Sequence, residues 1–317
     1  MNDSPPDLAD EPSASEPGGS RFFNGIVWTP RIEEAAQIAA LWINCDICGA
    51  AFWGLPRVGK SEFAKYFEKI ADEMFGGTVV VVRLNFGGEQ FHKAVQFLRR
   101  CLSTVGVRAS ATRDPEVLRT RLMDEIWSRC TPVTRRVVLI ADELQNVAPL
   151  LYGEFALMEA AISERYVPFL LCIGQPELQS TVANLEKNLH VMGRQFQELR
   201  EFRGLSLGDI EEFLSSLDGE SLSFSRQHFP SRVARGWSIV HLVESLRQAI
   251  NAAIDLDKLN LELFFPMAYL RQTLNYLFYF LIDDESVDVT AATVAEAFDR
   301  NGFRRLLMSY TKQKSAP

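Results

Sequence analysis

The chain has 317 residues, 47% of them hydrophobic and 23% charged, so it is long enough to bury a large core. Its formal net charge of −8 argues against a uniformly basic nucleic-acid-binding protein, and its longest apolar stretch near the C-terminus, Leu277 to Ile282, is far too short to span a bilayer. Five cysteines without disulfide-like spacing, and no apolar N-terminal segment that resembles a signal peptide, lead us to expect a soluble intracellular protein.

The negative charge is concentrated at the two ends of the chain. Residues 1–20 contribute −5 and residues 206–317 contribute −4, whereas residues 21–205 carry +1. A locally basic face on the middle segment is therefore open as an interpretation, beside the alternative that its arginines are solvated helix faces. The candidate residues are Arg99, Arg100, Arg108, Arg113, Arg119, Arg121, Arg135 and Arg136.

The N-terminal region predicts a tail followed by a capped helix. Residues 1–21 are rich in Pro, Ser, Asp and Gly, so we expect an acidic, disordered tail. Thr29 and Pro30, followed by Arg31 and two glutamates, predict a helix with Thr29 as its N-cap and proline at its first position. This helix leads to a short apolar strand over 49–53.

A phosphate-binding loop follows that strand. Residues 54–61 read Gly-Leu-Pro-Arg-Val-Gly-Lys-Ser and match the Gly-x4-Gly-Lys-Ser/Thr pattern. Gly54 and Gly59 let the backbone turn its N–H groups toward a triphosphate, Lys60 supplies a cation to the β- and γ-phosphates, and the Ser61 hydroxyl ligates Mg²⁺. An amphipathic helix follows and ends at two glycines, which supports this interpretation over a chance match. The predicted ATP-binding residues of the loop are Gly54, Pro56, Arg57, Val58, Gly59, Lys60 and Ser61.

Strands and helices then alternate. Apolar, β-branched runs predict strands over 78–85, 136–142 and 168–174, and helical spacing predicts helices at about 89–104, 115–130 and 153–164. This alternation predicts a parallel sheet with both faces covered, a three-layer αβα sandwich of the P-loop NTPase class. Beyond Leu205 the pattern is helical. We expect an acidic tail (1–21), a nucleotide-binding domain (22–205) and a helical lid (206–317).

The strand over 136–142 has the form of a Walker B motif. It delivers Asp142 beside the phosphate loop, where the carboxylate can hold Mg²⁺, and places Glu143 to orient or deprotonate a water molecule. Two acids at a strand end are also compatible with a solvated strand terminus. The spacing from Lys60 and the second buried strand favour a site that binds and hydrolyses a nucleoside triphosphate with Mg²⁺.

Cys45 and Cys48 form a single Cys-x-x-Cys pair. A zinc site needs two further ligands, and the four histidines are scattered. The pair precedes a phosphate loop and does not open a thioredoxin-like unit. We therefore expect two ordinary buried thiols.

The order of these motifs resembles that of AAA+ ATPases. Within them, the sequence is similar to the transposon target-selector ATPases of the TnsC/TniB type and their ExeA-type secretion relatives, over residues 22–205. The phosphate loop and Asp142-Glu143 carry the general resemblance. The more specific residues are Thr29-Pro30-Arg31, Ile173-Gly174-Gln175-Pro176-Glu177-Leu178 and Gly193-Arg194-Gln195-Phe196.

The resemblance implies further site residues. Gln175 resembles the sensor-1 residue, with a turn residue before Pro176 as the alternative. Arg194 resembles the arginine finger donated to a neighbouring subunit, and Arg200 and Arg203 compete for this role. Thr29 and Arg31 would border the adenine. The lid is the weakest part of the resemblance, because no clear sensor-2 motif is present there. Arg271 is named as a guess for the sensor-2 residue.

The resemblance also implies a function. A cytoplasmic, bacterial AAA+ regulator of this type would assemble with ATP as a ring or a helical filament on double-stranded DNA, which it would hold through phosphates. It would select the target DNA for a transposase together with a targeting protein, without a membrane, and ATP hydrolysis would drive disassembly. The alternative is a nucleotide-switched, partner-binding ATPase in secretion or signalling that does not bind DNA. A metabolic kinase is a third idea, but no acceptor pocket is recognisable.

Overall fold

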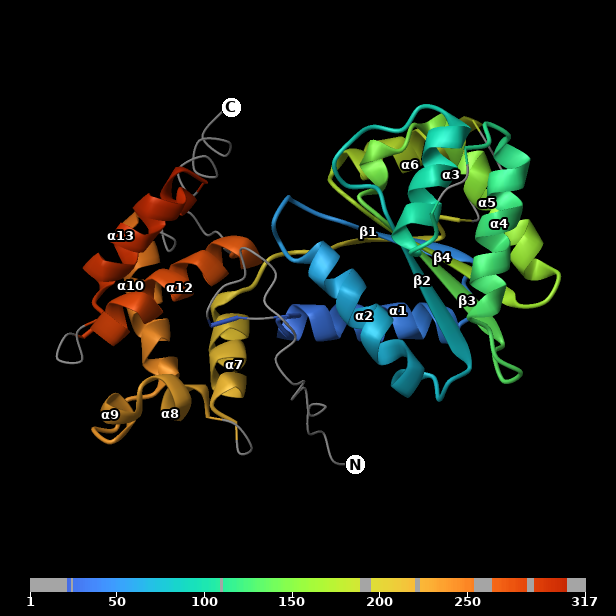
Figure 1. Cartoon of the computed structure of the whole chain (residues 1–317). Coiled ribbons are helices and arrows are strands. Elements are labelled where there is room, and N and C mark those ends of the chain that lie inside the picture. The colour runs from blue at the N-terminus through green and yellow to red at the C-terminus, as the bar shows by residue number, and fades with distance from the viewer. Residues whose placement is uncertain are drawn as a thin grey trace.

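The computed structural model describes residues 22–23, 25–108, 111–188, 195–219, 223–253, 264–283 and 288–306, and the tail expected at 1–21 lies outside them. These residues form an α/β part and a helical part beside it (Figure 1). Within these ranges, no helix combines the length and the hydropathy that crossing a membrane requires.

One parallel sheet forms the centre of the α/β part. Its five strands lie in the order β2-β3-β4-β1-β5, and every neighbouring pair is parallel. The four predicted strands are confirmed to within one residue, whereas the sequence does not predict β5. The strands are β1 (Gly49–Trp53), β2 (Val79–Asn85), β3 (Arg136–Asp142), β4 (Val167–Gly174) and β5 (Glu198–Glu201).

Helices cover both faces of this sheet, as predicted (Figure 1). Val138 and Ile140 of β3 pack into the cluster on one face, whereas Val137 and Leu139 pack into the cluster on the other. This alternation is the period of two that a strand buried on both faces requires. The first face carries α1 (Pro30–Asn44) and α2 (Lys60–Met74), and the second carries α3 (Ala94–Thr104), α4 (Pro115–Ser128), α5 (Tyr152–Ser163) and α6 (Glu177–Asn188).

The helix predicted from about residue 89 is wrong at its start, because α3 begins at Ala94. The N–H of Phe91 donates to the Asn146 carbonyl (2.8 Å), and the Phe91 carbonyl accepts from the Ala148 N–H (2.9 Å). Phe91 is therefore held in a parallel bridge beside Val147 and cannot enter a helix.

The helical part follows Leu205. Leu270, Leu274, Leu277 and Phe278 of one long helix are fully buried in its core, as expected of lid-core residues. Among the described residues its regular elements are helices: α7 (Leu207–Leu217), α8 (Phe224–His228), α9 (Pro230–Val233), the 3-10 turn η4 (Ile239–His241), α10 (Leu242–Ala253), α12 (Met267–Asp283) and α13 (Ala291–Asn301).

The segment before α1 joins the helical part. Phe22 and Phe23 are buried in the same core as α12, although they precede the α/β part in the chain. The Phe23 ring stacks on Phe224 at 6.0 Å between centroids, and Arg271 donates to the Phe23 carbonyl (2.7 Å). The chain therefore begins its described course in the lid before it enters the sheet.

We predict that Phe23 contributes to the stability of the helical part. Phe23→Ala is expected to lower the free energy of unfolding by about 3 kcal/mol, because it removes a buried aromatic ring and leaves a cavity. Leu41→Ala, at a position 60% exposed on α1, is the matched control and should change it by less than about 0.5 kcal/mol. Denaturant unfolding measures both, and equal stability of the two variants would contradict the prediction.

Candidate nucleotide-binding site

The phosphate loop connects β1 to α2 at the carboxyl edge of the sheet. Gly59 has φ +115°, a conformation that side chains rarely adopt, and it immediately precedes the first residue of α2. Gly54 is constrained by space, because a Cβ on it would lie 2.2 Å from the Phe202 carbonyl oxygen after β5. Both glycines are therefore required by the backbone. Arg57, between them, also has a left-handed φ of +68°.

Lys60 is buried at the start of α2. Its Nζ donates to the carbonyl oxygens of Gly54 (2.8 Å) and Leu55 (2.7 Å). Burial lowers the pKa of Lys60, and the nearby carboxylates of Glu143 and Asp142 oppose this effect. The ammonium group is thus held inside the loop, close to the two acids of the Walker B strand.

Asp142 is fully buried at the end of β3. Its Oδ1 accepts a hydrogen bond from the Ser61 hydroxyl (3.2 Å), whereas its Oδ2 has no hydrogen-bond partner in the described structure. Burial, followed by the charge of Glu143, raises the pKa of Asp142 to about 6. A buried carboxylate oxygen without a partner beside a hydroxyl is a donor set that suits Mg²⁺, which prefers oxygen ligands.

Glu143 lies next to two glutamine side chains. Its Oε2 accepts from Nε2 of Gln145 (2.5 Å) and lies 3.5 Å from Nε2 of Gln175. The Glu143 backbone has φ +62° and ψ +39°, in the left-handed region, at the start of the 3-10 turn η1 (Leu144–Asn146). The structure therefore brings together the predicted residues Lys60, Ser61, Asp142, Glu143 and Gln175 at one edge of the sheet.

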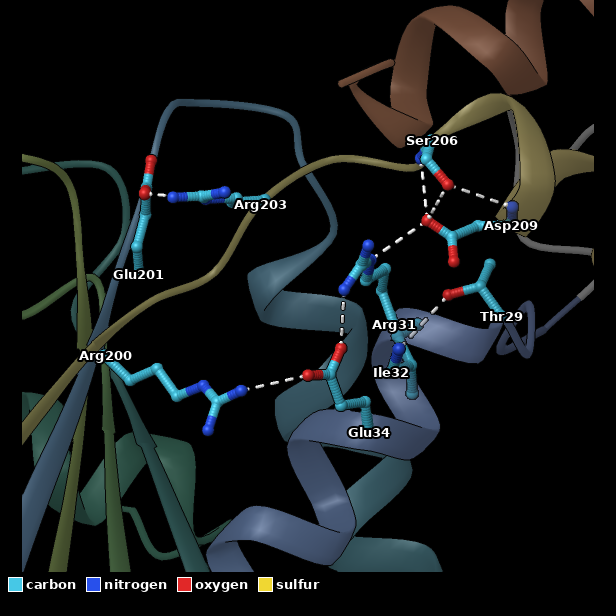
Figure 2. A network of polar contacts seen from close by, with 9 residues as sticks. All are labelled: Thr29, Arg31, Ile32, Glu34, Arg200, Glu201, Arg203, Ser206 and Asp209. Carbon is cyan, nitrogen blue, oxygen red and sulfur yellow. Dashed lines mark hydrogen bonds and ion pairs between the residues drawn. The ribbon is translucent and has the colours of Figure 1, made fainter. Parts of the chain in front are cut away.

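The residues predicted to border the adenine lie at the start of α1 (Figure 2). The Thr29 hydroxyl caps the helix by accepting from the Ile32 N–H (3.3 Å), as predicted for an N-cap. Arg31 pairs with Glu34 (2.7 Å) and with Asp209 at the start of α7 (3.0 Å), so it joins the α/β part to the lid. A cavity of about 280 Å³ lies beside them, lined by Arg31, Glu34, Ala35, Ile38, Phe52, Arg200, Glu201, Phe202 and Arg203.

The candidates for the arginine finger differ in their placement. Arg194 lies outside the described residues. Arg200 is bound to Glu34 of α1 (3.0 Å), and Arg203 is bound to Glu201 (2.8 Å), as Figure 2 shows. Both therefore contact carboxylates of their own chain, next to its own phosphate loop, which favours neither as a residue donated to a neighbour.

The lid contacts the phosphate loop directly. The Ala268 N–H at the start of α12 donates to the Arg57 carbonyl (3.1 Å), and the Arg57 guanidinium lies 5.6 Å from the centre of the Tyr269 ring. Arg271, the sensor-2 guess, points elsewhere in this structure, because it binds the Phe23 carbonyl. The lid residues nearest the loop are thus Met267, Ala268 and Tyr269.

The prediction that the Cys-x-x-Cys thiols are buried is wrong, since Cys45 and Cys48 are both exposed. They lie in the turn between α1 and β1, at the surface where the chain reverses. Within the described ranges, no group of three His, Cys, Asp or Glu side chains is arranged to hold a metal ion.

The arginines of the candidate basic face fall into two groups. Four are occupied by partners in the same chain: Arg99 by the carbonyls of residues 111 and 112, Arg100 by those of residues 85 and 87, Arg119 by Glu154, and Arg136 by Asp46. The side chains of the other four make no hydrogen bond or ion pair in the described part of the chain, and these residues are exposed; they are Arg108, Arg113, Arg121 and Arg135. The interpretation as a basic face therefore narrows to these four.

Two features of the site are missed by reasoning from the sequence. β5 has the sequence Glu-Leu-Arg-Glu, without the apolar alternation that predicts a strand, and it is placed by pairing with β1. Gln145 carries a weak signal only, because a glutamine two residues after an acid in a tight turn is able to reach back to that acid.

The strand order, the phosphate loop and the Asp-Glu strand define the P-loop AAA+ fold, which a helical C-terminal region follows. Residues 50–182 match the family described as AAA domain. Curated proteins give no match to this chain.

Solved structures with the same fold include Cdc6p from Pyrobaculum aerophilum, at 13% identity and a TM-score of 0.60, with 88% of this chain and 70% of that chain covered. The ADP form of the Aeropyrum pernix ORC2 protein matches at 13% identity and a TM-score of 0.57, over 87% and 70% of the two chains. Its ADPNP-ADP complexes match at 12% identity and a TM-score of 0.56, over 88% and 70%. At these identities the likeness concerns the fold.

We predict that Asp142 makes the protein less stable as pH rises. Its pKa is raised from 3.8 to about 6, so between these values the folded state keeps a proton that the unfolded state has released. Stability therefore falls from about pH 4 to about pH 6, and the ionised carboxylate remains unfavourable at higher pH. Asp142→Asn is expected to be more stable than the wild type by about 2 kcal/mol at pH 7.5 in EDTA.

The measurement is thermal or denaturant unfolding of both proteins from pH 4 to pH 8. The advantage of Asp142→Asn should shrink toward pH 4, where the folded wild type keeps its proton and the unfolded chain has taken up part of its own. Glu159, whose pKa burial raises to about 7, gives the same trend in both proteins and so cancels in the difference. A difference that does not change with pH would contradict the prediction.

Proposed function

We propose that this chain is an ATPase that binds ATP with Mg²⁺ at the carboxyl edge of its sheet and hydrolyses it. The observation that carries the proposal is the convergence of Lys60, Ser61, Asp142, Glu143 and Gln175 from three separate segments. The adenine nucleotides in the structure of the Aeropyrum pernix ORC2 protein support ATP as the ligand of this fold.

Each residue then has a role that its geometry supports. Lys60 Nζ would exchange its two carbonyl partners in the loop for phosphate oxygens, and Ser61 with Asp142 would hold Mg²⁺, which neutralises phosphate charge. Glu143 would accept the proton of the attacking water, and the Gln175 amide beside it would orient that water or a phosphate oxygen. Thr29 and Arg31 would border the adenine, next to the lid.

We further propose that ATP drives assembly into a homo-oligomer on duplex DNA, in which Arg194 acts on the nucleotide of the neighbouring subunit. In this proposal the oligomer marks target DNA for a transposase, and hydrolysis releases it. The support is the resemblance of Gly174 to Leu178 and of the segment around Arg194 to target-selector ATPases. The alternative is an ATPase that switches a protein partner, and the engagement of half of the candidate arginines within the chain favours it.

The catalytic proposal predicts that one substitution lowers kcat and that another lowers ATP affinity. Glu143→Gln is expected to lower kcat about 100-fold or more, because general bases contribute about this factor, while ATP affinity stays within about twofold. Lys60→Ala is expected to lose ATP affinity together with ATP-dependent assembly. Steady-state ATPase assays, nucleotide titration and sedimentation with duplex DNA measure these effects. Full turnover in Glu143→Gln, or ATP-dependent oligomers of Lys60→Ala on DNA, would refute the proposal.

The DNA-binding part predicts a change in salt dependence. An arginine that contacts a phosphate should, when changed to alanine, reduce the slope of log K against log [salt] by about one. We expect this for two or more of Arg108, Arg113, Arg121 and Arg135, and not for Arg136→Ala, whose guanidinium is paired with Asp46. Binding to labelled duplex between about 50 and 200 mM salt provides the test. An ATPase rate indifferent to DNA, with no binding, would favour the protein-partner alternative.

A further inference from the structure

Gln145 occupies a bridging position that the roles above do not use. It lies in the 3-10 turn η1 that follows the Walker B strand. Its Nε2 donates to Oε2 of Glu143 (2.5 Å), and its Oε1 accepts from the backbone N–H of Gln175 (3.0 Å). Since a carboxylate only accepts and an N–H only donates, these two partners fix which end of the amide is oxygen and which is nitrogen.

The backbone around Gln145 is held on both sides. The Asn146 N–H donates to the Glu143 carbonyl (3.0 Å), and the Val147 N–H donates to the Leu144 carbonyl (2.9 Å), which closes the turn. Asn146 also donates through its side chain to the Phe86 carbonyl (3.1 Å). Leu144 is fully buried. The Gln145 side chain therefore extends from an anchored turn.

The space around the amide is filled as well. A Cβ on Gly174 would lie 3.1 Å from Oε1 of Gln145 and 2.9 Å from a methyl carbon of Leu178, so the strand end carries glycine where the amide passes. The Gly174 carbonyl in turn accepts from the N–H of Gly54, the first residue of the phosphate loop (3.2 Å). A continuous path of hydrogen bonds and one peptide unit thus runs from Glu143 through Gln145 to the loop after β4 and on to the phosphate loop.

We propose that Gln145 is a positioning residue for Glu143: it holds the carboxylate in one orientation, and it links that orientation to the loop after β4 that carries Gln175. This inference rests on the proposed ATPase function. A general base must face the proton that it accepts, and the hydrogen bond donated to Oε2 restricts how the Glu143 carboxylate can turn. The hydrogen bond also restricts the conformations open to the Glu143 side chain. The backbone of Glu143 is itself in a region that non-glycine residues seldom adopt.

The first test compares Gln145→Leu with Gln179→Leu, the same change at an exposed position of α6. Gln145→Leu is expected to lower kcat about tenfold or more, while KM for ATP and the affinity for ADP stay within about twofold, because the phosphate contacts are untouched. Gln179→Leu should leave kcat within about twofold. A kcat of Gln145→Leu within twofold of the wild type would overturn the inference. A fall in kcat accompanied by comparable damage to KM and to thermal stability would also overturn it.

A second variant separates positioning from packing. Gln145→Glu keeps the shape but donates a hydrogen bond to Glu143 only when its own carboxyl is protonated. Its kcat relative to the wild type is therefore expected to rise several-fold as pH falls from about 8 to about 6. A ratio that does not depend on pH would contradict a donor role, and this comparison still applies if Gln145→Leu folds poorly.

A double-mutant cycle tests whether the Gln145 and Gln175 side chains act on Glu143 together. Because Gln145 and Gln175 contact the same carboxylate oxygen, the losses from Gln145→Leu and Gln175→Ala should combine to less than the product of the two fold-changes. Independent, multiplicative losses would overturn this joint action on Glu143. Glu143→Gln shows which proposal has failed. If this variant retains turnover, the proposed ATPase mechanism is wrong. If it is inactive while Gln145→Leu is fully active, only the role of Gln145 is wrong.

Discussion

The close approach of three backbones at Gly54 is the constraint on which the site depends. Its N–H donates to the Gly174 carbonyl at the end of β4, and its Cα faces the Phe202 carbonyl after β5 so closely that no side chain fits. The phosphate loop, the loop that carries Gln175 and the connection to the lid therefore meet at one residue. Movement in any of the three must be accommodated by the other two.

The same edge concentrates charge in a buried place. Lys60 and Asp142 are both nearly inaccessible, yet the structure pairs the lysine with carbonyl oxygens and leaves Oδ2 of Asp142 without a partner. A buried, unpaired carboxylate destabilises the folded chain, and a cation bound there would relieve that cost. Such an arrangement is typical of a site selected for binding, since a core residue at that position would be more stable.

The sequence is informative where the pattern is local. Alternation and β-branching predict the four central strands, and the fixed spacing of the phosphate loop predicts Lys60 and Ser61, because each signal lies within one element. It is uninformative where a position is set by a distant partner. β5 exists through its pairing with β1, and the start of α3 is delayed by the bridge between Phe91 and Val147. Two of the candidate arginines, Arg119 and Arg136, are likewise paired with carboxylates far along the chain.

The burial of Phe22 and Phe23 in the lid has a mechanical consequence. Two segments of the chain connect the lid to the sheet, one before α1 and one after β5. The Arg31–Asp209 ion pair also joins the two parts. A domain joined by one chain connection can rotate freely about it, whereas a second connection limits that rotation. Two chain connections and an ion pair therefore restrict rotation of the lid relative to the sheet more than a single connection would.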